Sequence, residues 1–262
     1  MSIKAIDSLS VHRLTSGQVV IDLQTAVKEL VENSLDANAT IIDLATVQTY
    51  GFRGEALSSL CTLCSSLTVV TATGEQAPIG TILEFNQDGK LKTSRSKTAR
   101  NKGTTVTVSE LFRPLPVRRK EFERNIKREF AKALSTLHGY ALVPCTKENN
   151  GVRLVVTNQI DKGSRSVQLQ TDGSSLKASV LSLWGPRSLD NILDLDLTFT
   201  VEINRSAILK KRGFQQNSIP VKVQGLISKF SPGCGRTNTD RQFFFVNGRP
   251  CNLNKTDSES SE

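Results

Sequence analysis

One segment of the sequence, residues 16–37, constrains the fold more than any other, because its apolar residues follow the period of a helix. At 100° per residue, measured from Glu29, its aliphatic side chains fall between about 100° and 240°. They are Val20, Leu23, Val27, Leu30, Val31 and Leu35. Glu29, Asn33 and Asp36 share a polar stripe opposite that arc. A helix with such a broad apolar face has to bury it against another layer, so the segment predicts a layered fold.

The rest of the chain predicts a mixture of helices and strands. Helices are expected near residues 54–63 and 117–140. Strands rich in β-branched residues are expected at 66–72, 80–85, 104–109, 152–157, 166–171, 197–204, 221–228 and 242–247. Because these elements follow no regular βαβ rhythm, the pattern favours an α+β chain. A glycine and two serines at 173–175 indicate a junction, which predicts domains at 1–175 and 176–255 and a disordered acidic tail at 256–262.

Positive charge is concentrated in two regions of the sequence. Residues 90–132 carry fourteen Lys and Arg against four Glu, and residues 205–249 carry nine Lys and Arg against one Asp. Residues 1–60 are mildly acidic. Two basic regions beside an acidic one predict a polyanionic partner, and a generally basic surface that only aids solubility is the alternative. No apolar run approaches the ~18 residues that a membrane span requires.

Glu29 and Asn33 form the first pattern that suits catalysis. They lie four residues apart, so their side chains project next to each other from one helical face. An amide oxygen is a hard ligand suited to Mg²⁺, and a carboxylate can accept a proton from water. Phosphoryl transfer depends mainly on such positioning and on charge neutralisation. Polar residues on a polar helix face are more often simply solvated, and this pattern alone does not separate the two interpretations.

Two glycine-containing segments carry the remaining patterns. Residues 50–57 (YGFRGEAL) have two glycines three residues apart and then open a helix, whose N-terminal amides favour a phosphate. Residues 101–106 (NKGTTV) form a glycine turn that leads into a strand with two hydroxyl groups. Glycines before a helix or strand are common, so each segment is a weak signal by itself.

Taken together and in this order, the three motifs resemble the N-terminal ATPase region of the MutL-type DNA mismatch repair proteins, within the GHKL superfamily. Other stretches are similar to the PMS-type subunit of that family. They are residues 11–19 (VHRLTSGQV), 54–61 (GEALSSLC), 115–118 (LPVR), 233–236 (GCGR) and 240–247 (DRQFFFVN). The resemblance implies a GHKL (Bergerat-type) ATPase α/β sandwich followed by a truncated ribosomal-S5-like domain. An Hsp90-like module has similar ATP chemistry, but the stretch at 240–247 argues against it.

The same resemblance implies roles for individual residues. Glu29 would be the general base of ATP hydrolysis, and Asn33 would hold Mg²⁺ against the triphosphate. Asp36 and Ala37 would line the nucleotide pocket, and Thr105 would lie near the adenine. Backbone amides would wrap the phosphates along Gly51, Phe52, Arg53, Gly54, Glu55, Ala56 and Leu57.

Partners are implied in the same way. The family uses ATP as a switch that closes a lid and brings two N-terminal modules together on DNA. The implied partners are mismatch-containing duplex DNA, an MLH-type homologue as the heterodimer subunit, and MutS-type proteins, in the nucleus and without a membrane. Arg236, Arg241 and Arg249 are the implied DNA contacts, in agreement with the basic region at 205–249.

The sequence departs from the family pattern in two places. In the family, the strand corresponding to residues 40–44 is followed by a second strand, an Asp-Asn-Gly-x-Gly motif and a flexible lid. Here Leu44 runs directly into residues 45–51, and no Asp-Asn-Gly occurs in the chain. After Pro250 and Cys251 the sequence again leaves the pattern.

The internal gap leaves two interpretations open. The gap itself has two possible origins. One is a truncated or alternatively spliced product or a gene-model error, and the other is a segment left out of the sequence. The chain is therefore either an ATP-binding and hydrolysing switch that acts in a heterodimer, or a nucleotide-incompetent fragment that retains DNA or partner binding.

Overall fold

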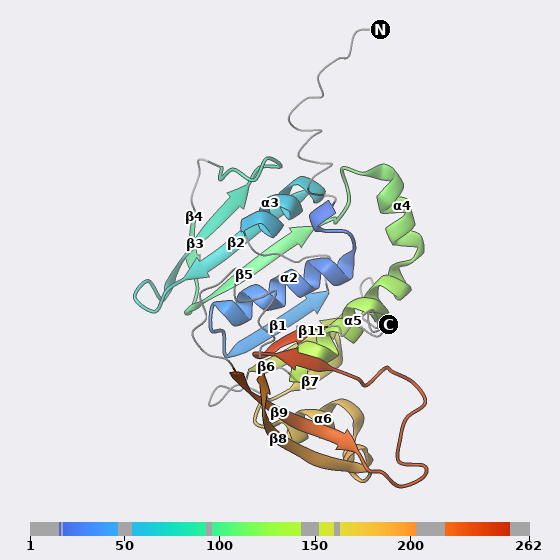
Figure 1. Cartoon of the computed structure of the whole chain (residues 1–262). Coiled ribbons are helices and arrows are strands. Elements are labelled where there is room, and N and C mark those ends of the chain that lie inside the picture. Colours follow the sequence, from blue (N-terminus) through green and yellow to red (C-terminus); the bar gives the residue numbers. More distant parts are fainter. Residues whose placement is uncertain are drawn as a thin grey trace.

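A computed structural model describes residues 16, 18–46, 54–92, 96–142, 152–159, 163–202 and 218–251 of the 262-residue chain. Its helices are α2 (Leu23–Asp36), α3 (Gly54–Leu63), α4 (Pro116–Arg124), α5 (Ile126–Leu142), α6 (Leu176–Trp184) and the 3-10 helix η2 (Pro186–Leu189). Its strands are β1 (Ile41–Thr46), β2 (Ser66–Ala72), β3 (Ile79–Phe85), β4 (Ser96–Ala99), β5 (Gly103–Ser109), β6 (Arg153–Asn158), β7 (Ser166–Thr171), β8 (Ile192–Glu202), β9 (Ser218–Ser228), β10 (Phe244–Val246) and β11 (Arg249–Cys251). Helices α2, α3 and α5 cover the strands as one layer, which is the arrangement that the amphipathic helix predicts (Figure 1).

The strands from β1 to β7 form two sheets rather than one. β4, β3, β2 and β5 form an antiparallel sheet in that order. β1, β6 and β7 form the other, in which β1 and β6 are parallel. Among the described residues, β1 and β5 are therefore edge strands. The break in the sheet follows β1, the strand after which the sequence departs from the pattern that it otherwise resembles.

The hydrophobic core is divided in the same way. One cluster of buried side chains joins α2 and α5 to β1, β6 and β7, and a second joins α3 to β2 and β5. Helix α2 contributes Val27 to the first cluster and Ala26 to the second. Leu111 and Phe122 pack against both clusters. The broad apolar arc of α2 thus holds the two halves together.

Two helices differ from the sequence prediction at their ends. The helix predicted at 16–37 is interrupted at residues 20–22: residues 16, 18 and 19 are helical, and the Val20 N–H donates to the Ser16 carbonyl at 3.0 Å. α2 then begins at Leu23, because the Asp22 carboxylate accepts the Thr25 N–H at 2.8 Å and caps the helix. The helix predicted at 117–140 is divided at Asn125, which ends α4 before α5 begins. Asparagine competes with the helix through its own side chain and is favoured at such ends.

Two antiparallel strand pairs follow in the C-terminal part of the described chain. β8 and β9 pair along their whole length of eleven residues. β10 and β11 form a short hairpin. Phe245 of this hairpin and Leu183 of α6 pack against the cluster formed by α2, α5 and the three-stranded sheet. The hairpin is thereby placed close to α2, and the domain division near residue 175 stays a prediction.

Candidate nucleotide site on helix α2

Helix α2 carries the three polar residues that the sequence singles out, Glu29, Asn33 and Asp36. None of them belongs to the buried core, to which the helix contributes its aliphatic residues. The helix ends where the Ala37 N–H donates to the Asn33 carbonyl at 3.0 Å. Ala37 is exposed at this end, beside Asp36. The stripe therefore runs along α2 toward its C-terminal end.

The Asn33 amide is the most unusual polar group of this stripe. Its Oδ1 and Nδ2 atoms are both shielded from solvent, and neither has a hydrogen-bond partner among the described residues. Leaving such a group unpartnered costs about 1–3 kcal/mol. A buried polar group without a partner is explained by strain, by a functional role or by a bound water or ion. The Asn33 oxygen is of the type that Mg²⁺ prefers, so this residue fits the predicted ion.

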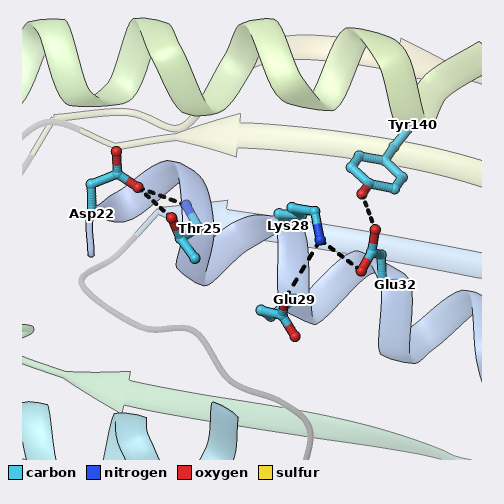
Figure 2. A network of polar contacts seen from close by, with 6 residues as sticks. All are labelled: Asp22, Thr25, Lys28, Glu29, Glu32 and Tyr140. Carbon is cyan, nitrogen blue, oxygen red and sulfur yellow. Dashed lines mark hydrogen bonds and ion pairs between the residues drawn. The ribbon is translucent and has the colours of Figure 1, made fainter. Parts of the chain in front are cut away.

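Glu29 lies beside a polar network that links α2 to α5 (Figure 2). Lys28 Nζ is 2.9 Å from Glu32 Oε2 and 3.5 Å from Glu29 Oε1. The hydroxyl of the buried Tyr140 donates to Glu32 Oε1 at 2.5 Å. Figure 2 shows Glu32 directed toward Tyr140 and Glu29 directed to another side of the helix. Glu29 keeps 29% of its side chain exposed, so water can reach its carboxylate.

The network shifts the protonation equilibria of its members. Burial would raise the pKa of Glu32, but hydrogen bonds from Tyr140 and Lys28 stabilise the carboxylate and hold its pKa below the usual value. Burial also opposes the charged form of Lys28, but Glu32 and Glu29 outweigh burial and raise the pKa of the lysine. Burial and the hydrogen bond to Glu32 raise the pKa of the Tyr140 hydroxyl. At neutral pH the network thus contains an ammonium, a carboxylate and a neutral phenol.

Tyr140→Phe is expected to destabilise the fold by about 1.5–3 kcal/mol near pH 7, because it removes a hydrogen bond to a charged group. The folded-state pKa of Glu32 lies below its ordinary value of 4.5. The contribution is therefore fully present above that pH and is lost as the pH falls through the folded-state pKa. Urea denaturation of both proteins near pH 7 and pH 3 measures the difference. In a Glu32→Gln background the difference should no longer depend on pH, and equal stabilities near pH 7 would contradict the expectation.

Asp36 pairs with a residue that is distant in the sequence. Arg249 Nη2 on β11 lies 2.9 Å from Asp36 Oδ1, across 213 residues of the chain. Both residues line a cavity of about 20 Å³ between the end of α2 and the β10–β11 hairpin. A cavity of this size holds about one water molecule, so it is too small for a nucleotide. The ion pair fastens the hairpin to the end of the candidate site.

Part of the predicted phosphate-binding segment lies outside the described residues, namely Gly51, Phe52 and Arg53. The first residues of α3 are described by their backbone alone, and they are Gly54, Glu55 and Ala56. The Leu57 side chain packs against the cluster of α3, β2 and β5. Thr105 lies on the edge strand β5, opposite Val70, with an exposed side chain. The nucleotide contacts of all these residues stay predictions.

The three arginines predicted to contact DNA each have a partner within the chain. Arg236 donates to both carboxylate oxygens of Asp240, at 3.3 and 2.7 Å. The Arg241 guanidinium lies over the ring of Trp184, 4.9 Å from its centroid. Arg249 is held by α2 as described above. Exposed ion pairs contribute only about 0–1 kcal/mol, so Arg236 and Arg249 can exchange partners. The role of all three arginines at DNA stays a prediction.

Sequence reasoning did not include Lys28, Glu32 and Tyr140 in the site. Lys28 and Glu32 carried a usable signal, because opposite charges four residues apart attract each other on a helix. Tyr140 carried none, since it lies 108 residues from Glu32 and reaches it only through the packing of α5 on α2.

Within the described ranges, no group of three His, Cys, Asp or Glu side chains could hold a metal ion. A Mg²⁺ ion at Asn33 would therefore complete its shell with phosphate oxygens and water, as this ion commonly does. In the same part of the chain, none of the helices is both long and apolar enough to cross a bilayer.

Comparisons with known proteins identify clear relatives. The mismatch repair endonuclease PMS2 of Gallus gallus is 40% identical, over 95% of this chain and 33% of its own length. The DNA mismatch repair protein PMS1 of Saccharomyces cerevisiae is 38% identical, over 95% of this chain and 33% of its own length. The chain therefore spans about one third of the length of these curated relatives. No protein-family model matches it.

The alignment with the Gallus gallus protein extends over 296 positions, which is more than the 262 residues of this chain. The alignment must contain gaps on the side of this chain. The relative therefore has residues in the aligned range that this chain lacks.

Two solved structures of related DNA repair proteins also resemble this chain. A crystal structure of the N-terminal domain of a DNA repair protein is 37% identical, with a TM-score of 0.76, over 92% of this chain and 78% of that one. The Aquifex aeolicus MutL ATPase domain complexed with ADP is 23% identical, with a TM-score of 0.56, over 87% of this chain and 82% of that one. The second comparison shows that the two chains share a fold. In sequence and in fold, this chain belongs to the MutL family of DNA mismatch repair proteins and, within it, to the PMS type.

Proposed function

We propose that the chain is the N-terminal module of a PMS-type mismatch repair protein and works as an ATP-dependent switch. The observation that carries this proposal is the Asn33 amide, which is shielded from solvent and has no hydrogen-bond partner in the described part of the chain. It lies one helical turn from the partly exposed Glu29. A protein with the same fold, the Aquifex aeolicus MutL ATPase domain, was solved with ADP. Both observations support a nucleotide as the ligand of this face of α2.

Each residue of the site has one task in this proposal. Asn33 holds Mg²⁺, which offsets the negative charge of the triphosphate. Glu29 accepts the proton of the attacking water. Lys28 Nζ lies 3.5 Å from Glu29 Oε1, so its positive charge stands beside this carboxylate. Asp36 lines the pocket, and Arg249 has to release it or share it when a nucleotide binds.

Single-turnover ATP hydrolysis with Mg²⁺ tests the catalytic part. Glu29→Ala is expected to lower the rate about 10²–10⁴-fold, which is the usual contribution of general acid–base catalysis, and to retain ATP binding. Asn33→Ala is expected to weaken Mg²⁺-dependent binding. Glu75→Ala removes an exposed glutamate in a turn and serves as the matched control, with rate and binding unchanged. A rate in Glu29→Ala equal to that of the wild type would refute the role of Glu29.

A nucleotide-incompetent module that binds DNA or a partner protein is the second candidate. It is favoured by the divided sheet, in which β1 and β5 are both edges, and by the lack of an Asp-Asn-Gly motif in the sequence. Titration with a fluorescent ATP analogue and Mg²⁺ separates the two candidates. If the wild type binds the ATP analogue and Asn33→Ala does not, the result supports the ATP-dependent switch. A folded chain that binds no nucleotide supports the second candidate.

The remaining parts of the proposal concern partners and location. The PMS-type relatives carry mismatch repair in their names. From this relationship we infer action on mismatch-containing duplex DNA in the nucleus, together with an MLH-type homologue and MutS-type proteins. The division into domains at 1–175 and 176–255 is part of the same proposal. Co-purification with an MLH-type homologue tests the heterodimer directly.

A further inference from the structure

The two-stranded ribbon formed by β8 and β9 has one apolar and one polar face. In an antiparallel pair, residues directly opposite each other point to the same side, and successive pairs alternate between the two sides. Leu193 pairs with Ile227 near one end of the ribbon, and every second pair from there to the other end shares their side. All side chains on this side are apolar, and together they are called the apolar face. They are Leu193, Leu195, Leu197, Phe199, Val201, Ile219, Val221, Val223 and Ile227.

The charged residues of the ribbon all lie on its other face. They are Asp194, Asp196, Glu202 and Lys222. Lys177 of α6 forms an ion pair with Asp194 at 2.7 Å, and Gln224 Nε2 donates to Asp196 at 2.8 Å. Helix α6, which lies next to the ribbon in Figure 1, therefore approaches it from the polar face and leaves the apolar face open.

The described part of the chain places no packed layer on the apolar face. Seven of its side chains are between 38% and 52% exposed, and neither buried cluster includes a residue of the ribbon. Gly225 lies on this face opposite Leu195, and a Cβ atom there would meet no atom within 4 Å. A two-stranded ribbon is only marginally stable in water by itself and gains stability when another layer covers its apolar side. The apolar face therefore calls for a covering partner.

We propose that the apolar face is an interface at which two copies of this chain associate and form a small β-sandwich. Sheets that pack face to face lie about 10 Å apart with their side chains interdigitated. A twofold contact brings the same patch of both copies together, and this patch has no charged residue, so no like charges are opposed. The ribbon carries three acidic residues and one lysine, whereas the whole chain has a net charge of +9. Two copies therefore repel each other less here than at the basic regions.

The composition of the apolar face favours a second copy over a different protein. Interfaces between different proteins are about as polar as the rest of the surface, whereas homodimer interfaces are more apolar and resemble a core cut in half. The apolar face has no polar side chain and is of the second kind.

The area of the apolar face sets the strength of the association. Eleven residues of strand span about 37 Å, and two strands with their side chains are about 10–12 Å wide, so each copy offers about 400 Å². The total of about 800 Å² is less than the roughly 1,200–2,000 Å² that stable complexes bury. We therefore expect a weak dimer with a dissociation constant in the micromolar range or above.

This inference does not depend on the proposed function, so its test contains neither nucleotide nor DNA. Sedimentation velocity of the full chain is measured from about 1 to 200 µM, a range over which a weak dimer forms. The wild type is expected to change from monomer to dimer. Gly225→Glu is expected to raise the dissociation constant of the dimer about 100-fold or more, because it buries an unpaired carboxylate in the interface. The variant removes no side chain, and the face has room for the new one, so the monomer should keep its fold.

Gly235→Glu is the matched control. It makes the same chemical change outside the ribbon, at a glycine where a Cβ atom also meets nothing within 4 Å. This variant is expected to form dimers as the wild type does. Hydrogen exchange at low and high protein concentration locates the contact, because association stabilises the elements that it covers. Added protection is expected in β8 and β9.

Four results would overturn the proposal. A wild type that stays monomeric, with a lower melting temperature in Gly225→Glu than in Gly235→Glu, means that other residues of the same chain cover the apolar face. A monomer with equal melting temperatures in both variants means that nothing covers it. A dimer that both variants retain, or that both weaken equally, associates elsewhere or through net charge. Assemblies that grow beyond the dimer indicate pairing at the open edges of β8 and β9 instead of their faces.

Discussion

Phe112→Ala is expected to lower the free energy of unfolding by about 3–5 kcal/mol, a large share of what a domain of this size possesses. The Phe112 side chain is 1% exposed and lies in the cluster of α3, β2 and β5. Its ring meets that of Phe122 edge to face at a centroid distance of 5.6 Å and supports the Arg118 guanidinium. Truncation removes these contacts together and leaves a cavity at the base of α4.

Phe230→Ala is the control for this substitution, because the Phe230 side chain is 90% exposed. Its effect should stay within about 0.5 kcal/mol, as for most surface changes. Urea denaturation gives both values, and hydrogen exchange should show the loss of protection for Phe112→Ala first in α3, β2 and β5. A Phe112→Ala protein within about 1 kcal/mol of the wild type would mean that this cluster is not required for stability.

Gly173→Ala combines two costs at one position. Gly173 has a φ of 72°, which is the left-handed region that side chains other than glycine disfavour by about 1–2 kcal/mol. A Cβ atom there would also lie 2.5 Å from the backbone nitrogen and 2.6 Å from the carbonyl oxygen of Val152. Backbone cannot rotate away as a side chain can, so we expect a further loss of about 1–3 kcal/mol from overpacking. Val152 leads into β6, so the displacement would disturb the pairing of β6 with β1.

Gly233→Ala separates the cost of the left-handed backbone conformation from the cost of the clash with Val152. Gly233 has a φ of 81°, but a Cβ atom there meets nothing within 4 Å. It should therefore show the backbone cost alone, and the difference between the two variants measures the clash with Val152. Thermal and urea denaturation of both variants provide that difference. Equal destabilisation by the two substitutions would show that β6 yields to the added methyl group without cost.

Local signals were sufficient for much of the secondary structure. The strands predicted at 66–72 and 166–171 have those bounds in the structure, because alternating β-branched residues report a half-buried strand directly. Helix α6 was not predicted. It is only nine residues long, and the serine interpreted as part of a junction is its cap, with the Ser175 hydroxyl accepting the Ala178 N–H at 3.1 Å. The break of the long helix at Asn125 was also missed, since the apolar period continues across it.

The candidate site was predictable in part. Helical periodicity places Glu29 and Asn33 next to each other, and the structure keeps them on one helix. The shielding of the Asn33 amide depends on what packs over α2, which no local pattern reports. The division of the sheet between β1 and β5 is visible only in the strand order, and its consequence for the core only in the packed clusters.

By itself the sequence determined the family, the amphipathic helix α2 and the presence of two basic regions, because these depend on residue types and on spacing along the chain. Only the tertiary structure decided that Tyr140 meets Glu32 and that Arg249 meets Asp36, across 108 and 213 residues. The physical reason is that hydrogen bonds and ion pairs act over a few ångströms, and the packing of the layers chooses which distant side chains come that close.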